Sequence, residues 1–447
     1  MGILRRLAAY LKPYPQVIIL LLASLLAGLA GELAMPRLLG LIVDHGISSG
    51  SMAAVLQYTG FLAVVALVRS ACHYTQACSQ ERLGQEVIRG LRHDLFVRLQ
   101  RLSFTYHTLH ATGDQMSRLT SDVYSIMEFF GFGIAEMLGS GFVFVGTITM
   151  LLITDWQLAL AVMTPIPVLM FFAFRFSGIV GPLWEQIREE MGKLTATLQE
   201  SVSGVRVVKA FSREQHEIAK FRMRSEATLH ARLRRAATQA RTFPLLHFIT
   251  GFCFLILYWY GGRRVYYGEM TLGTFFSFNW YLWGLIWPVR FLGYLIGVAR
   301  KAMAAGPRVF AILDSPLEIV EAQDLREMPK ITGRVLFHDV SFAFEDSSTT
   351  PVLKHLNLEI EPGQIVAVLG RTGSGKSSLA NLLPRFYDPQ EGQVTIDGID
   401  IREVTLSSLR KQIGIVPQET ILFSDTVRNN IAFGRPDAPF KEVEAAA

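Results

Sequence analysis

The sequence has few cysteines and few charged residues. Its three cysteines, Cys72, Cys78 and Cys253, show no C-x-x-C spacing and lie within or beside apolar runs, which argues against a disulfide framework and against a zinc site. Only 18% of the 447 residues are charged, whereas 50% are hydrophobic, and the mean hydropathy is +0.31. An ordinary soluble domain has less apolar content. The composition therefore indicates a membrane protein.

The net charge of +5 does not indicate a nucleic-acid partner. The basic residues lie mainly beside apolar segments, where they favour a cytoplasmic position, so no nucleic acid is expected. Arg5 and Arg6, followed by an apolar run, also fit a secretory signal with cleavage after Ala30. Because further apolar runs follow, we expect the first one to remain as a membrane span.

Six apolar stretches approach or exceed the length that a helix needs to cross a bilayer. They cover about 17–40, 55–78, 129–153, 157–178, 243–265 and 272–298. The long connections, 79–128 and 179–242, are rich in arginine and lysine, whereas 41–54 contains neither. By the positive-inside rule the long connections and both termini are cytoplasmic, although Arg263 and Arg264 on an outer turn oppose it. We expect a multi-pass protein of the cell (plasma) membrane.

The two long connections are predicted to continue the spans as amphipathic helices. Apolar residues recur in them at helical spacing: Leu83, Val87, Leu91, Leu95, Leu99 and Leu102, then Leu183, Ile187, Met191, Leu194, Leu198, Val202 and Val205. Because such stripes need a partner surface, we expect both to pack in a helix bundle. The predicted turns at His110–Asp122 and Ser203–Gln215 lie far from the membrane and are expected to touch a cytoplasmic structure.

After Gly333 the sequence changes to a soluble α/β pattern. The strand-like runs "RVLFHDVSFAF", "VLKHLNLEIEPG" and "QIVAVLG" precede a glycine-rich loop, and the helical run "SSLANLLPRF" follows it. The loop consists of Gly370, Arg371, Thr372, Gly373, Ser374, Gly375, Lys376, Ser377 and Ser378. Its spacing fits the phosphate-binding P-loop, in which glycines let backbone N–H groups approach phosphate oxygens.

This loop predicts ATP and Mg²⁺ as cofactors. Lys376 would reach the β and γ phosphates, Ser377 would bind Mg²⁺, and the following helix would direct its positive end at the anion. Gln418, at the end of the strand-like "LRKQIGIVPQ", offers a neutral oxygen that could bind Mg²⁺ or hold a water. A plain surface glutamine is the alternative for Gln418.

With these motifs in this order, the chain resembles half of an ABC exporter of the multidrug and lipid-flippase type. The resemblance rests on the six spans, "VSFAF", "GRTGSGKSS" and "VPQETILFSDTVRNNIAFG", and extends to "TGDQMSRLTSDV" and "GVRVVKAFSRE" in the inner loops. It implies an all-α six-helix transmembrane domain with long cytoplasmic extensions (1–312), a linker (313–332) and the first part of an α/β P-loop domain (333–447).

The resemblance also implies roles for single residues. Phe344 would stack on adenine, although tyrosine is more frequent at that position. Gln418 would sense the γ-phosphate and Mg²⁺, and the two inner turns would be the coupling helices that contact the nucleotide domain. ATP binding would then drive the membrane helices.

Residues 1–447 lack other motifs that the resemblance implies: an LSGGQ-like signature, a Walker B aspartate with a catalytic glutamate, and a switch histidine. "LSSLR" at 406 lacks the glycine pair, and "QVTID", which ends at Asp397, is too polar and too close to Lys376 for the Walker B strand. We therefore expect no catalytic residue and no ATP hydrolysis by this chain alone, because no carboxylate can polarise the attacking water. An incomplete reading frame is the expected reason; a catalytically inert ATP-binding regulatory subunit of a membrane complex is the alternative.

One P-loop and six spans imply a homo- or heterodimer with another half-transporter in the lipid bilayer. The expected function is ATP-driven export of a hydrophobic or amphipathic drug or lipid. Aromatic residues share one face of the sixth span and could line its path, or merely pack against helices and lipid: Phe276, Trp280, Trp283, Trp287, Phe291 and Tyr294. Glu32, Arg69 and Glu136 lie within apolar spans, and their roles stay open between function and structural pairing.

Overall fold

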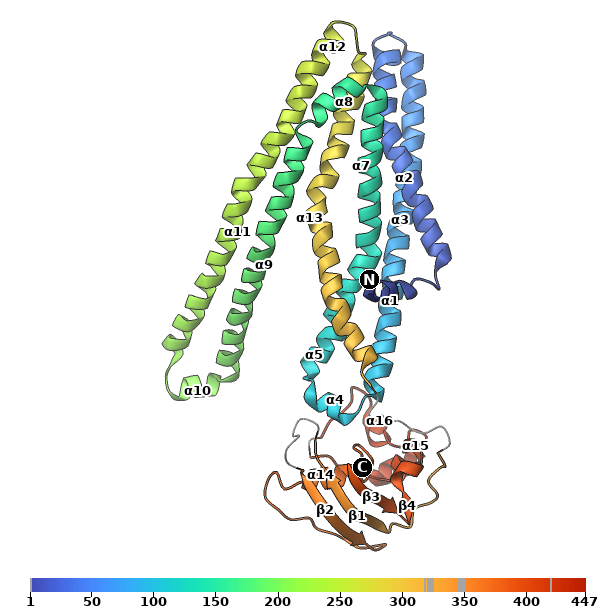
Figure 1. Cartoon of the computed structure of the whole chain (residues 1–447), viewed down its shortest axis with the longest axis vertical. Coiled ribbons are helices and arrows are strands. Elements are labelled where there is room, and N and C mark those ends of the chain that lie inside the picture. The colour runs from blue at the N-terminus through green and yellow to red at the C-terminus, as the bar shows by residue number, and fades with distance from the viewer. Residues whose placement is uncertain (1, 317–318, 320–324, 345–350, 419) are drawn as a thin grey trace. The chain divides into compact units, whose positions relative to one another are not determined.

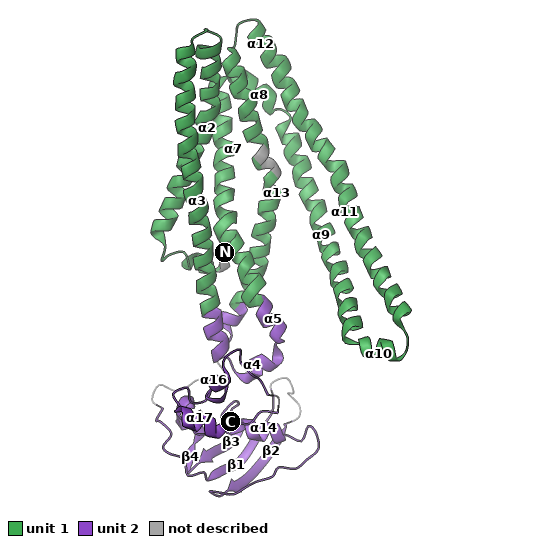
Figure 2. Ribbon diagram, turned by 180° about the vertical axis from the view of Figure 1, so that it is seen from behind, with its two compact units in different colours: residues 1–93, 118–310 green, residues 94–117, 311–447 purple. Residues whose placement is uncertain are grey.

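The computed structural model of the chain describes residues 2–316, 319, 325–344, 351–418 and 420–447. It divides into two compact units (Figure 2). The helical unit comprises residues 1–93 and 118–310, and the sheet unit comprises residues 94–117 and 311–447. The segment 94–117 therefore belongs with the C-terminal part of the chain, although helical-unit residues flank it in the sequence.

Long helices form most of the helical unit (Figure 1). They are α2 (Pro15–Leu41), α3 (Met52–Arg101), α7 (Ile134–Thr154), α9 (Ile166–Ser203), α11 (Glu214–Ile256) and α13 (Leu272–Asp314). Shorter helices are α1 (Gly2–Ala9), α6 (Val123–Glu128), α8 (Trp156–Met163), α10 (Val205–Ala210) and α12 (Gly262–Tyr266). π-Helical turns occur at Ile42–Ile47, Arg118–Asp122, Phe129–Gly133 and Leu257–Gly261.

Five helical stretches of the described chain are long and apolar enough to cross a membrane. They are Pro15–Ile47, Met52–Arg101, Thr112–Thr154, Trp156–Ser203 and Glu214–Tyr266, and they contain the first five predicted spans. The sixth predicted span, 272–298, lies in α13, where several side chains are outside the described part. As predicted, α3 and α9 continue well beyond the length of a span, with 50 and 38 residues.

The two predicted apolar stripes differ in burial. All six residues of the first stripe, from Leu83 to Leu102, are buried, as predicted. In the second stripe only Ile187 is buried, whereas Met191, Leu198, Val202 and Val205 are exposed. The prediction that this stripe is packed is therefore wrong for the single chain. Helix α9 packs along α11 in a hairpin closed by α10 (Figure 1), and this pairing leaves much of the stripe uncovered.

Two glycines bring the backbones of α2 and α13 into contact. A Cβ atom on Gly273 would lie 2.0 Å from the carbonyl oxygen of Gly40, and a Cβ on Gly40 would lie 2.7 Å from the carbonyl oxygen of Gly273. The Ser277 hydroxyl donates to the carbonyl of Pro36 at 2.8 Å across the same crossing. Only glycine permits such a close approach.

Polar contacts extend this crossing on both sides. The Asp44 carboxylate accepts from the N–H of Gly273 at 2.7 Å and from the Thr271 hydroxyl at 2.6 Å. Toward the other end, the Tyr281 hydroxyl donates to the carbonyl of Leu33 at 2.7 Å. We call this set of contacts, from Leu33–Tyr281 to Asp44–Thr271, the α2–α13 seam.

The sheet unit contains a four-stranded antiparallel sheet in the order β2-β1-β3-β4. The strands are β1 (Val335–Phe342), β2 (Leu353–Ile360), β3 (Glu391–Ile396) and β4 (Ile399–Asp400). The helices are α4 (Phe104–Leu109), α5 (Thr112–Ser117), α14 (Lys376–Leu382), α15 (Leu406–Arg410), α16 (Val427–Ile431) and α17 (Phe440–Ala446), with a 3-10 turn at Ile401–Glu403. Its core includes Phe337, Val340, Leu382, Val394 and Leu409.

Two predicted strands are not formed, although both segments lie in the described part of the chain. Neither "QIVAVLG" before the glycine-rich loop nor the run before Gln418 is a strand. Ile365 and Val416 are almost fully exposed, at 101% and 96%. Runs that are apolar on both faces are typical of strands buried between parallel neighbours. The antiparallel sheet observed here pairs with neither run, so they remain extended segments.

Candidate functional site

The glycine-rich loop adopts a backbone that only its glycines can take. Gly373 and Gly375 have φ angles of +84° and +89°, in the left-handed region. A Cβ atom on Gly375 would lie 2.9 Å from Leu353 of β2, and one on Gly370 would lie 2.5 Å from the Ser374 hydroxyl. The loop is therefore a narrow backbone cradle directly before α14.

Lys376 is the first residue of α14 and its side chain folds back over this loop. Its Nζ donates to the carbonyls of Gly370 and Arg371, each at 2.8 Å. Ser377 is exposed and Ser378 is buried. A positive charge above a left-handed glycine cradle, with an exposed hydroxyl beside it, fits a nucleotide phosphate with its Mg²⁺.

Phe344 and Gln418 lie outside the loop itself. Phe344 follows β1, is half-buried and packs edge-on against Phe342 and Tyr387, with ring centroids 4.9 and 5.4 Å apart. It belongs to the same apolar cluster as Leu379 of α14. Gln418 is exposed on the segment that follows α15. The predicted roles of both residues toward ATP stay predictions.

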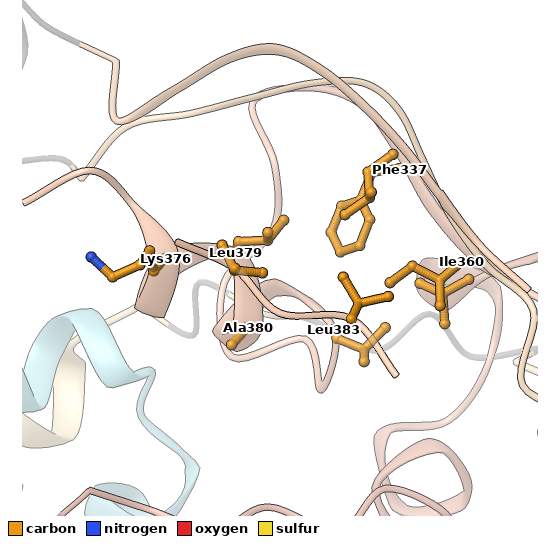
Figure 3. Close-up of a pocket in the computed structure, with 10 residues that line it drawn as sticks. Phe337, Ile360, Lys376, Leu379, Ala380 and Leu383 are labelled. Carbon is orange, nitrogen blue, oxygen red and sulfur yellow. The ribbon is translucent and has the colours of Figure 1, made fainter. Parts of the chain in front are cut away.

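A cavity of about 160 Å³ lies behind the loop, between α14 and the sheet (Figure 3). Apart from Lys376, the residues that line it are apolar, among them Phe337, Ile360, Leu379 and Leu383. Hydrocarbon walls do not stabilise a triphosphate, because a buried anion needs paired charges or donors. The cavity is therefore not suited to phosphate, and the ammonium of Lys376 points away from its apolar residues, toward the carbonyls of the glycine-rich loop (Figure 3).

Asp397, rejected above as a Walker B aspartate, has a structural role. Its carboxylate accepts from the backbone N–H of Thr332 at 2.6 Å, from that of Arg334 at 2.9 Å and from the Thr332 hydroxyl at 2.6 Å. Burial raises the pKa of Asp397, but these hydrogen bonds together hold it below the ordinary value. The residue fastens the start of β1 to the end of β3.

The predicted substrate-path aromatics lie on α13. Phe276, Trp280 and Trp283 are about half exposed, at 52%, 53% and 56%. Trp283 also contacts Phe254 of α11, with centroids 5.1 Å apart, so part of this face packs against a helix. The side chain of Trp287 lies outside the described part of the chain.

Two of the three ionisable residues singled out in the spans, Glu32 and Arg69, form an ion pair. Arg69 lies 3.5 Å from the Glu32 carboxylate, and its guanidinium also contacts the Met35 sulfur at 3.6 Å. Pairing of this kind is the usual state of charges in a span. It supports the structural interpretation for Glu32 and Arg69.

One aromatic contact within the sheet unit was not predicted. The ring of Phe104, the first residue of α4, lies 4.3 Å from that of Phe386 and 6.4 Å from that of Tyr387. Phe104 precedes the turn His110–Asp122 that was predicted to make such a contact. The local signal was a pair of aromatic residues in each of two otherwise largely polar segments, "RLSFTYH" and "PRFYD", far apart in the sequence.

Comparisons with known proteins place both parts of the chain. Residues 17–289 match the model of the ABC transporter transmembrane region, and residues 353–447 match that of the ABC transporter family. The chain is 36% identical over 453 residues to an ATP-dependent lipid A-core flippase of Syntrophus aciditrophicus, covering 100% of this chain and 74% of the flippase. It is 36% identical over 379 residues to the flippase of the same name from Desulfotalea psychrophila, covering 85% of this chain and 66% of that one. An uncharacterized ABC transporter ATP-binding protein of Bacillus subtilis, YknU, is 34% identical over 444 residues, with 99% and 76% covered.

Proposed function

Because the chain belongs to the ABC transporters that join a transmembrane region and an ATP-binding region in one polypeptide, we propose that it is a subunit of an ATP-driven exporter of hydrophobic or amphipathic molecules. The observation that carries the proposal is the left-handed glycine cradle with Lys376 folded over it. The inert regulatory subunit is not favoured, because several of the relatives are named as ATP-dependent flippases.

In this function the loop Gly370–Ser378 holds the phosphates of ATP. Lys376 balances phosphate charge, Ser377 and Gln418 bind Mg²⁺, and Phe344 stacks on the base. Bound Mg²⁺ would neutralise charge on the phosphate oxygens. We also propose the domain boundaries 1–312, 313–332 and 333–447. The end of α13 at Asp314 and the start of β1 at Val335 support them, whereas the division into compact units differs by grouping 94–117 with the C-terminal part.

The substrate class follows from the exposed aromatic face of α13 and from the flippase relatives. We propose a lipid or a flat apolar molecule as substrate. Replacing Trp280 and Trp283 together by alanine should weaken binding of ethidium or of a fluorescent phospholipid about five-fold or more, because each ring contributes apolar contact. Trp156→Ala serves as the control, since Trp156 is also exposed, at 61%, but lies on α8. If the double variant in nanodiscs binds both probes with unchanged affinity, the aromatic residues of α13 contribute to packing and not to substrate binding.

We also propose that residues 1–447 bind ATP without hydrolysing it, because their sequence contains no Walker B strand whose aspartate is followed by a glutamate that could polarise water. Phosphate release by this polypeptide in nanodiscs should equal that of its Lys376→Ala variant. Hydrolysis that the variant abolishes would mean that a catalytic carboxylate exists within these residues. Asp397 is not a candidate, because its oxygens are occupied by residues 332–334.

The exposed half of the second stripe supports the proposed dimer. Met191, Leu198, Val202 and Val205 leave an apolar surface on the α9–α11 hairpin that one chain does not cover. A second half-transporter, identical or different, would cover it. The basic inner connections support a cytoplasmic position for both termini in the plasma membrane.

A further inference from the structure

The helix that follows the phosphate loop ends in a turn that presents Phe386 to Phe104. The N–H of Phe386 donates to the carbonyl of Asn381 at 3.1 Å, and the N–H of Arg385 donates to that of Leu382 at 3.0 Å. Arg385 has a φ angle of +53°. This is the hydrogen-bond pattern of a Schellman helix end, in which the left-handed position is usually glycine. We call residues 383–388 the Phe386 turn.

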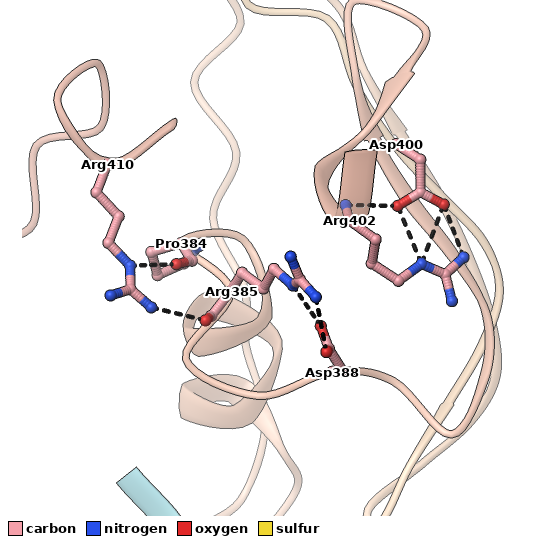
Figure 4. Close-up of polar contacts among 6 residues, drawn as sticks. All are labelled: Pro384, Arg385, Asp388, Asp400, Arg402 and Arg410. Carbon is pink, nitrogen blue, oxygen red and sulfur yellow. Dashed lines mark hydrogen bonds and ion pairs between the residues drawn. The ribbon is translucent and has the colours of Figure 1, made fainter. Parts of the chain in front are cut away.

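An arginine at this left-handed position is strained by about 1 kcal/mol, so other contacts must hold the turn. The buried Arg385 side chain pairs with Asp388, donating from Nε to Oδ1 at 2.7 Å. Arg410 donates from Nε to the carbonyl of Pro384 at 2.9 Å and from Nη2 to that of Arg385 at 2.8 Å (Figure 4). Its guanidinium carbon also lies 5.1 Å from the centre of the Phe386 ring.

Arg410 thus ties two segments of the sheet unit at one point. Helix α14 begins at Lys376 of the phosphate loop and ends at the Phe386 turn. Helix α15 ends at Arg410, and the segment after it leads to Gln418. Both segments that the proposed function brings to the nucleotide therefore meet at the turn that carries Phe386.

We propose that Arg410 is a positioning residue, through which the contact between Phe104 of α4 and Phe386 depends on the bound nucleotide. Arg410 fixes the conformation of the Phe386 turn, and this turn holds the Phe386 ring against Phe104. A shift of α14 or of the Gln418 segment therefore displaces Phe386 and changes its contact with α4. This proposal rests on the proposed function for its nucleotide-dependent part. The lock itself rests on the hydrogen bonds and ring contacts alone.

The planar fork of arginine is needed because two carbonyls accept from two different nitrogens of one guanidinium. A lysine at 410 would offer its donors from a single nitrogen on a flexible chain, so it would not hold the two carbonyls at the fixed spacing of the guanidinium fork. Arg402 provides a matched control, because it is another arginine of the sheet unit whose guanidinium donates to Asp400, at 2.7 Å, and to no carbonyl of the turn; it acts on Asp388 only through its charge (Figure 4).

The test measures amide hydrogen exchange in the chain in nanodiscs, for the wild type and for Arg410→Met, Arg410→Lys and Arg402→Met, with and without MgATP. Without nucleotide, Arg410→Met should speed exchange at least about five-fold at residues 104–109 as well as at 383–388. Arg410→Lys should have an intermediate effect, and Arg402→Met should leave 104–109 as in the wild type. MgATP should change exchange at 104–109 in the wild type but not in Arg410→Met, whose ATP affinity should stay within about two-fold.

A purely structural role for Arg410 would speed exchange at 383–388 while residues 104–109 exchange as in the wild type, and that result would overturn the proposal. An equal effect of Arg402→Met at 104–109 would also overturn it. If the wild type binds no MgATP, the proposed function fails, whereas the nucleotide-free comparison still decides whether Arg410 locks α4.

Discussion

Lys376→Ala should weaken MgATP binding about 10- to 150-fold. The ammonium lies over the glycine cradle and bonds the carbonyls of Gly370 and Arg371 at 2.8 Å, so it is already held where phosphate oxygens would approach. Charge-assisted hydrogen bonds of this kind contribute roughly 1.5–3 kcal/mol, which corresponds to that range of affinity. Titration of a fluorescent ATP analogue into the nanodisc-embedded chain measures the change.

The matched control is Lys441→Ala, because Lys441 is an exposed lysine of α17 outside the loop. It removes the same charge from the same unit and should leave the affinity unchanged. Equal affinities of wild type and Lys376→Ala would exclude the loop as the phosphate site. Phe344→Tyr, which keeps the ring, should bind nearly as well as the wild type if stacking on the base is what Phe344 contributes.

Gly273→Ala should prevent the helical unit from folding to its observed form. The added Cβ atom would lie 2.0 Å from the carbonyl oxygen of Gly40. The α13 backbone fixes the position of this Cβ atom and the α2 backbone fixes that of the oxygen, so neither can move without its helix. Overpacking typically costs about 1–3 kcal/mol, and a rigid contact such as this one lies at the upper end of that range. Separating the helices would also break the hydrogen bonds of Asp44 and Ser277 in the α2–α13 seam. The fraction of monodisperse protein after detergent extraction, and its thermal unfolding, measure the loss.

Two further alanine variants should destabilise the protein less than Gly273→Ala does. In Gly40→Ala the nearest atom is the Ser277 hydroxyl, at 2.3 Å, which can rotate, although a carbonyl lies at 2.7 Å. Gly297→Ala lies on the same helix α13 with nothing within 4 Å, so it should be close to neutral. A Gly273→Ala protein as stable as Gly297→Ala would mean that the two helices do not cross at these glycines.

The backbone of the glycine-rich loop could be predicted because it depends on local chemistry. Its glycine spacing, between an apolar run and a helical run, predicted the loop, and Gly373 and Gly375 have left-handed φ angles that glycine adopts readily. Its role toward phosphate stays a prediction. The first apolar stripe was likewise predictable from its 3.6-residue period, and its six residues are buried. The mostly helical architecture with a small C-terminal sheet follows from the same patterns.

Features that depend on distant partners could not be predicted in this way. The apolar run around Ile365 has the composition of a buried strand, yet a strand forms only where a neighbour offers its hydrogen bonds. Phe104 and Phe386 meet through the fold, and no period or motif links them. The exposed stripe on α9 and the buried stripe on α3 have the same helical spacing of apolar residues. This spacing predicts that each helix has an apolar face, but it does not identify the surface that covers that face.

The α2–α13 seam has a consequence for biosynthesis. Its contacts join residues 229 and 241 positions apart, Asp44 to Gly273 and Pro36 to Ser277. At roughly 5–20 residues per second, a ribosome needs about 10–50 s to make the intervening chain. During that time α2 lies in the bilayer without α13, which later packs against Gly40. The Asp44 carboxylate also lacks its two donors, the Gly273 N–H and the Thr271 hydroxyl. Completion of the seam is therefore a late event in translation, and we infer that variants at Gly40 or Asp44 are detected by quality control only after nearly the whole membrane region has been inserted.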